Sequence, residues 1–169
     1  YIKENKIHDV IENMVGKDSF YNNISKLNDI EFSDDCFISE SILPTKVGYG
    51  DGMSIIISDF LTENNYESAI DFLVDKRRDL FCFQVLSKDE LKPSSRGKVH
   101  FYDSENVNNQ YRKNINKNVM KAYYEALNYI TNRIKNYCHS RNANYLLVPS
   151  DMAISEIFLR LLPEMGVLK

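Results

Sequence analysis

The chain has 169 residues and a mass of 19.7 kDa, which fits one domain of ordinary size. Hydrophobic residues make up 43% and charged residues 27%, so the composition excludes disorder of the whole chain, a collagenous repeat and a disulfide scaffold. The net charge of −3 gives no overall basic footprint, so we expect no nucleic-acid partner, and no apolar run approaches the roughly 20 residues of a membrane helix.

The first third of the chain predicts small elements. Weak apolar alternation over residues 1–15 predicts two short strands. Helix-start signals stand at Asp18 and at Ser33, each followed by apolar residues at helical spacing. Pro44 is expected to end the second of these helices.

Three short apolar runs predict the strands of a sheet. They span residues 53–59, 80–86 and 145–148, are rich in β-branched, leucine or aromatic residues, and are nearly uninterrupted by polar ones. Such runs are typical of parallel strands that are buried on both faces. We therefore expect helices on both sides of this sheet.

Helical patterns follow or separate these runs. Asn64 with Glu67 three residues later resembles a capping box. Apolar residues at alternating steps of three and four predict a long helix over 118–140. Ser150 or Asp151 is expected to cap a final helix, and Pro163 is expected to end it.

An insertion, residues 87–113, interrupts this alternation. Two strand-like segments flank Ser104-Glu105-Asn106 and predict a small hairpin. The first part of the insertion has mixed charge. The insertion as a whole is either a solvated connection or an arm that contacts a partner.

The element order predicts an α/β fold with a doubly wound, mostly parallel, Rossmann-like sheet and a small β-hairpin insertion. Ligands bind such sheets outside the carboxyl ends of the strands. That rule selects Ser58-Asp59, Ser87 and Ser150-Asp151. Asp59 is the most informative of them, because a carboxylate at a strand end either caps a turn or coordinates a hard cation.

Other chemical motifs are weak. Gly48, Gly50 and Gly52 precede a strand instead of following one, which favours a turn over a phosphate cradle. The three histidines are scattered, and Ser150 has no nucleophile elbow around it.

Three widely spaced cysteines, Cys36, Cys82 and Cys138, form no CxxC pair. They indicate neither a zinc site nor a redox dithiol. Free buried thiols in a reducing compartment are expected instead, and hence a cytoplasmic location.

Several segments carry a resemblance to a known family. Residues 55–61 resemble the fourth-strand signature of von Willebrand factor A domains. The segments 83–91 and 101–105, Ala122-Tyr123-Tyr124 and a late strand ending at Asp151 follow in the order shown by the bacterial family catalogued as domain of unknown function 58. The chain therefore resembles that family, as a single domain over 1–169 whose first strand is missing.

The resemblance implies a metal-ion-dependent adhesion site. That site uses a DxSxS loop, a threonine from a middle loop and an aspartate after the fourth strand. Asp59 matches the last part, and Asp35 lies near the middle part, but this sequence has no DxSxS. We expect Mg²⁺ or Mn²⁺ to bind a longer protein that supplies the loop, and not to bind this chain tightly.

The resemblance also implies a noncatalytic protein-binding module that works with a MoxR-type AAA+ ATPase in assembly or maturation. A metal-free scaffold that presents its loops and hairpin is one alternative. An α/β phosphoryl hydrolase that uses Asp59 and Asp151 is another, although the DxDx[TV] nucleophile motif is absent.

Overall fold

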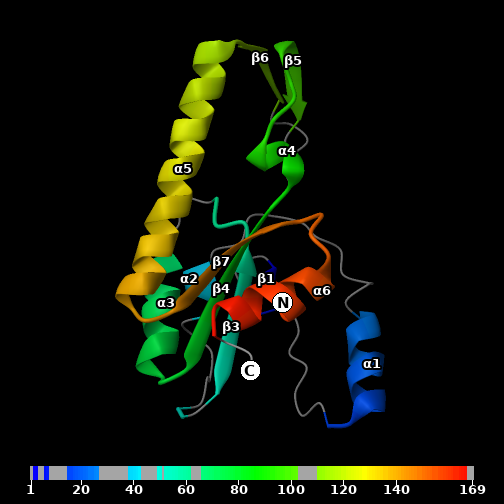
Figure 1. The fold of residues 1–169 in the computed structure, drawn as a ribbon, viewed down its shortest axis with the longest axis vertical. Coiled ribbons are helices and arrows are strands. Elements are labelled where there is room, and N and C mark those ends of the chain that lie inside the picture. Colours follow the sequence, from blue (N-terminus) through cyan, green and yellow to red (C-terminus); the bar gives the residue numbers. More distant parts are fainter. Residues whose placement is uncertain are drawn as a thin grey trace.

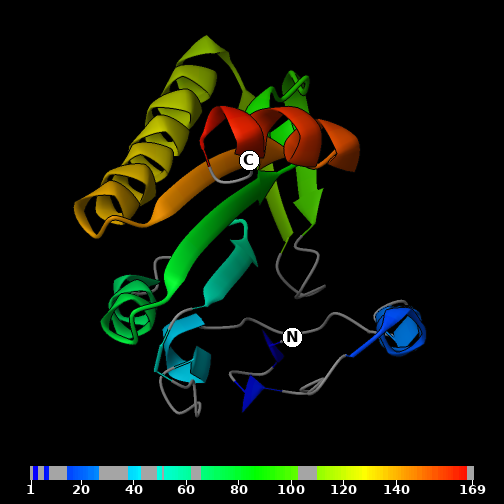
Figure 2. The same cartoon turned by 60° about the horizontal axis from the view of Figure 1, so that its bottom comes forward.

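The structure is a computed structural model. It describes residues 2–3, 6–7, 15–26, 38–42, 49–50, 52–61, 66–102 and 110–166. The strands are β1 (Ile2–Lys3), β2 (Lys6–Ile7), β3 (Met53–Ser58), β4 (Asp79–Leu86), β5 (Gly97–Tyr102), β6 (Gln110–Ile115) and β7 (Asn144–Pro149). The helices are α1 (Lys17–Ser25), α2 (Ile38–Ile42), α3 (Tyr66–Asp75), α4 (Lys88–Leu91), α5 (Lys117–Ser140), α6 (Ile154–Glu156), the π-helical η2 (Ile157–Leu161) and α7 (Leu162–Glu164). Figures 1 and 2 show their arrangement.

The central sheet has the strand order β3-β4-β7, and both pairs are parallel. In the central strand β4, Cys82 pairs with Ile56 of β3 on one side and with Tyr145 of β7 on the other. The hairpin of β5 and β6 is a separate antiparallel pair. The predicted α/β class, with a mostly parallel sheet and a small hairpin insertion, is confirmed.

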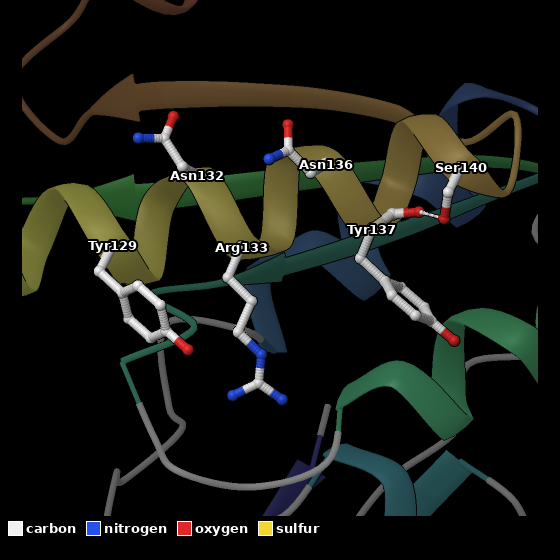
Figure 3. Close-up of a pocket in the computed structure, with 6 residues that line it drawn as sticks. All are labelled: Tyr129, Asn132, Arg133, Asn136, Tyr137 and Ser140. Carbon is white, nitrogen blue, oxygen red and sulfur yellow. Dashed lines mark hydrogen bonds between the residues drawn. The ribbon is translucent and has the colours of Figure 1, made fainter.

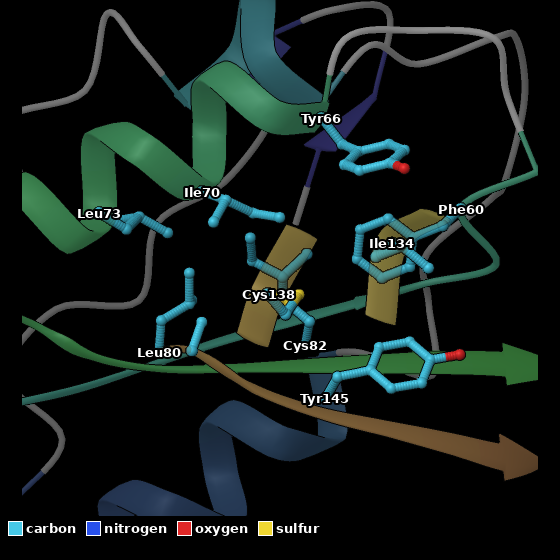
Figure 4. Close-up of a cluster of buried hydrophobic side chains, with 11 residues drawn as sticks. Phe60, Tyr66, Ile70, Leu73, Leu80, Cys82, Ile134, Cys138 and Tyr145 are labelled. Atoms are coloured by element: carbon cyan, nitrogen blue, oxygen red, sulfur yellow. The ribbon is translucent and has the colours of Figure 1, made fainter. Parts of the chain in front are cut away.

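The main core lies between one face of the sheet and the helices α3 and α5. Figure 4 shows side chains from all three layers in one cluster. Cys82 of β4 and Cys138 of α5 meet there as free, fully buried thiols, as the sequence predicted. A hydrogen bond to Cys138, together with burial, raises the pKa of Cys82. Because both side chains are fully buried in this cluster, they act as small core residues.

The other face of the sheet is covered unevenly. Phe81 of β4 and Val148 of β7 are 5% and 6% exposed, so this face is closed over the centre of the sheet. On β3, however, Ile55 and Ile57 are 51% and 69% exposed. The prediction that this strand is buried on both faces is therefore wrong, since the described residues cover only the face that carries Ile56.

The long helix α5 links the core to the hairpin. Its buried residues are Leu127, near the middle of the helix, and Ile134 and Cys138, which lie in its second half. Its first half rises beyond the sheet and stands beside β5 and β6 (Figure 1). The hairpin thus projects at one end of the molecule.

A short helix at the base of the hairpin was not predicted. Ser87 accepts a hydrogen bond from the Glu90 backbone, and the Glu90 carboxylate accepts one from the Ser87 backbone. This reciprocal capping box begins α4. The hydroxyl of Tyr123 then donates to the Glu90 carbonyl at 2.6 Å, which ties α4 to α5.

Replacing Tyr123 by phenylalanine is expected to lower the free energy of unfolding by about 1 kcal/mol, because the half-buried Glu90 carbonyl loses its donor. Amides of α4 should then exchange with solvent faster. Urea denaturation and hydrogen–deuterium exchange measure both effects. Tyr124→Phe is the matched control, since Tyr124 is 38% exposed, and an equal effect of both variants would contradict the role of this bond.

The C-terminal helical segment differs from the prediction. Its first turn is preceded by Ala153, which makes no side-chain cap, so neither Ser150 nor Asp151 caps it. Helical backbone also continues through Pro163 to Glu164. Proline is tolerated there because it stands at the start of α7, directly after the wider turn of η2.

The N-terminal predictions are met where the structure describes them. The strands β1 and β2 pair with each other, and α1 begins one residue before Asp18. The predicted helix start at Ser33, the capping residue Asn64 and the hairpin turn at 104–106 lie outside the described residues. Within the described part, no helix is long and apolar enough to cross a membrane.

Candidate functional site

The carboxyl end of β3 forms a tight turn around Asp59. The Ser58 hydroxyl accepts a hydrogen bond from the Phe60 amide at 3.1 Å, and the Asp59 carboxylate accepts one from the Leu61 amide at 3.2 Å. Phe60 has a φ of 52°, a left-handed conformation that is uncommon for an aromatic residue. Its side chain is 1% exposed, so burial of the ring holds this conformation.

A buried glutamine fixes the backbone of this turn. Gln84 of β4 is fully buried, and its Nε2 donates to the Asp59 carbonyl at 2.7 Å. Its Oε1 accepts from the Tyr145 hydroxyl at 2.6 Å. Burial raises the pKa of Tyr145 well above its ordinary value, so this hydroxyl remains a donor. The network therefore sets where the Asp59 carboxylate stands at the rim.

Tyr66 closes the same region from α3. Its ring meets Phe60 edge to face at 5.7 Å between centroids, and the Arg133 guanidinium lies 5.7 Å from the Tyr66 ring centroid. The Tyr66 hydroxyl is buried and has no hydrogen-bond partner among the described residues. Burial raises the pKa of this phenol, so it remains neutral.

The other predicted rim residues do not gather around Asp59. Ser87 caps α4, while Ser150 donates its backbone amide to Leu86 at 2.9 Å. Asp151 is exposed in the turn after β7. Because β4 separates β3 from β7, Asp59 and Asp151 follow strands that lie roughly 10 Å apart.

The described residues do not fit a divalent-cation site. They contain no group of three histidine, cysteine, aspartate or glutamate side chains close enough to hold an ion. Asp59 supplies one carboxylate, and one of its oxygens already accepts the Leu61 amide. Asp35 lies outside the residues that the structure describes.

We expect Mg²⁺ or Mn²⁺ to shift the melting temperature of this chain by less than about 1 °C, because the Asp59 carboxylate is engaged in its own turn and the sequence has no DxSxS loop to supply further ligands. A cation that bound tightly to the folded state would raise the melting temperature. Thermal melts of the wild type and of Asp59→Asn test this. Asparagine keeps the turn-closing acceptor and removes the charge. A cation-dependent rise in the wild type that is lost in Asp59→Asn would contradict this expectation.

A polar groove of about 550 Å³ runs along α5 (Figure 3). Arg133 in this groove binds Glu67 of α3 at 2.9 Å, and the Tyr137 hydroxyl donates to Asp71 at 2.7 Å. Arg141 contacts the same aspartate at 2.9 Å. These contacts join α5 to α3, so the groove is explained by the packing of the two helices.

A second hollow, of about 780 Å³, lies at the base of the hairpin. Its apolar lining includes Pro93, Ile115 and Met120. Arg96 and Lys117 are among the cations around it. The hollow is partly open to solvent, so it is a surface depression and not an enclosed cavity.

Sequence reasoning missed both Gln84 and this hollow. A single glutamine within the apolar run 80–86 was a visible signal of a buried polar contact. Its partners, however, are 25 and 61 residues away in the chain. The hollow brings together residues from before and after the hairpin, which the sequence alone does not place together.

Comparisons with known proteins assign no family. A scan against protein-family models found no match, and no curated protein matches the chain. One solved structure that resembles it is a protein from the universal stress protein family of Burkholderia pseudomallei, with 12% identity and a TM-score of 0.27. That alignment covers 70% of this chain and 76% of the other.

Proposed function

We propose that this chain is a noncatalytic protein-binding module. The proposal is supported above all by how the carboxyl edge of the sheet is used. The side chains of Ser58 and Asp59 each accept a backbone amide hydrogen bond that closes the turn after β3, and Ser87 accepts one that caps α4. These residues build the loops at the edge where an α/β enzyme would place its reacting groups.

The partner that we propose is a MoxR-type AAA+ ATPase, on the resemblance to the domain of unknown function 58 family. The engagement of Asp59 within its own turn favours binding that does not depend on a cation. The separation of Asp59 from Asp151 speaks against a shared acid–base pair for phosphoryl hydrolysis.

Reconstitution from purified components tests this function. We expect a stable complex of this chain with a MoxR-type ATPase in size-exclusion chromatography with light scattering, unchanged by EDTA. Loss of the complex in EDTA would contradict cation independence, and no complex under any condition would contradict the partner. Turnover in a phosphatase and esterase screen would contradict a noncatalytic role.

A further inference from the structure

Positive charge is concentrated in one part of the chain. We call residues 92–121 the arm. The arm contains seven basic residues, lysines and arginines together, and two acidic residues. The arm carries a net charge of +5 and the remaining residues carry −8, which together give the net −3. All seven cations are described and exposed: Lys92, Arg96, Lys98, Arg112, Lys113, Lys117 and Lys121.

The hairpin places aromatic side chains among these charges. Phe101 and Tyr111 are cross-strand partners, so they lie on the same face of the hairpin. They are 43% and 57% exposed. Lys113 and Ile115 lie on this face too, because they follow Tyr111 at steps of two residues.

This face leads into the hollow at the base of the hairpin. Ile115 belongs to both, and the hollow continues with Met120 and Tyr124 of α5. Arg96, Lys117 and Lys121 line it as well. The result is one surface with an aromatic pair at one end, an apolar hollow at the other, and cations along its length.

In the part of the chain that the structure describes, little of this charge is neutralised. Lys121 lies 3.7 Å from Glu125, and both side chains are well exposed. The other six cations have no ion-pair partner among the residues that the structure describes. Arg96, Lys113, Lys117 and Lys121 lie on the surface described above, whereas Lys98 and Arg112 alternate to the other face of the hairpin. Like charges held on one surface repel one another, so a ligand with several carboxylates would be favoured there.

We infer that the arm is a docking surface for an acidic protein segment that carries aromatic or other apolar side chains. This inference rests on the proposed protein-binding function and names the surface and the chemistry of the partner. Carboxylates of the segment meet the arm cations, while an apolar side chain enters the hollow beside Ile115 and Met120. The rest of the chain, at −8, repels a long polyanion such as a nucleic acid, which favours a short acidic segment.

The test uses the whole chain and defined probes. The main probe is a fluorescein-labelled peptide of about twelve residues, long enough to span the hairpin and the hollow, with one phenylalanine for every three glutamates. A second peptide replaces each phenylalanine by serine. An oligothymidylate of similar length and phosphatidylserine vesicles represent the other polyanions.

Fluorescence anisotropy is expected to show tighter binding of the phenylalanine peptide than of the serine peptide, by roughly tenfold. Vesicle co-sedimentation should be absent. Binding should weaken between about 50 and 200 mM NaCl, because the contacts are exposed and therefore screened.

The charge-reversal variant Arg96→Glu/Lys117→Glu/Lys121→Glu should weaken peptide binding by at least about tenfold. The matched control, Lys17→Glu/Lys26→Glu/Lys135→Glu, changes the net charge equally at exposed positions outside the arm and should shift affinity less than about threefold. Tyr111→Ser keeps the charge of the arm and should weaken binding of the phenylalanine peptide more than binding of the serine peptide. Circular dichroism melts verify that each variant is folded.

Four results would each overturn this inference. They are binding of the oligonucleotide as tight as that of the peptide or tighter, binding to vesicles, an equal loss of peptide affinity in the control variant, and no binding of the peptide to the wild type. If no peptide binds, the lysines serve only to prevent the exposed edges of β5 and β6 from pairing with other chains. If the complex with the ATPase still forms, the arm assignment alone is wrong. If that complex fails as well, the proposed function is wrong.

Discussion

Replacing Gln84 by methionine is expected to lower the free energy of unfolding by about 2–3 kcal/mol. The substitution conserves most of the side-chain volume but removes one donor and one acceptor. The Tyr145 hydroxyl and the Asp59 carbonyl then lose the partners that they have at 2.6 and 2.7 Å. A buried hydroxyl without a partner is costly, so the tyrosine contributes most of the loss.

A double-mutant cycle identifies this cause. Gln84→Met/Tyr145→Phe removes the orphaned hydroxyl and should be less destabilised than Gln84→Met alone, by about 1 kcal/mol. Urea denaturation of the wild type, both single variants and the double variant measures the coupling. Asn132→Met, at an exposed position of α5, is the control and should change stability by less than about 0.5 kcal/mol. Strictly additive losses would contradict the hydrogen-bond explanation.

The same variant reports on the turn after β3. Without the amide of Gln84, the Asp59 carbonyl is no longer fixed, and the left-handed Phe60 loses part of the packing context that holds it. We expect the amides of Phe60 and Leu61 to exchange faster in Gln84→Met. The turn that displays Asp59 therefore depends on a residue from the neighbouring strand.

The strands and helices near the core could be predicted because their signals are local. Strands β4 and β7 and the helix α5 were predicted within one or two residues, since apolar runs and helical periodicity are encoded in adjacent positions. The capping box at Ser87 was equally local, with Glu90 three residues later, and was overlooked within a polar stretch.

The exposure of β3 could not be predicted from its own residues. Its apolar run resembles that of β4, yet Phe81 is 5% exposed and Ile57 is 69% exposed. The difference depends on which segments cover each face of the sheet, and this is a property of the tertiary structure. For the same reason, the sequence indicated the candidate Asp59 but not the glutamine that positions it.

The arm shows a third kind of limit. Its cations were visible in the sequence, but the first part of the insertion also contains Asp89 and Glu90 and therefore looked mixed in charge. In the structure these two residues belong to α4, with Glu90 committed to the capping box. Exposed lysines and arginines follow on the hairpin and at the start of α5.

Replacing Ile134 by alanine is the second large expected effect, with a loss of about 2–4 kcal/mol in the free energy of unfolding. Ile134 is fully buried where α5 packs against α3 and the sheet, so truncation leaves a cavity (Figure 4). For a chain of this size the melting temperature should fall by roughly 6–12 °C. Lys135→Ala, one position further and exposed, is the control and should have little effect.

Hydrogen–deuterium exchange on Ile134→Ala would show whether the arm opens independently of the core. The buried residues of α5 begin near its middle, at Leu127, and continue with Ile134 and Cys138, whereas the arm is joined to its N-terminal end. We therefore expect amides of β4, β7 and the second half of α5 to exchange roughly a hundredfold faster, while those of β5 and β6 keep the rate set by their own local opening. Equal acceleration in the hairpin would mean that arm and core unfold as one unit, and the charge-reversal variant would then have to be interpreted as a change in the stability of the whole fold.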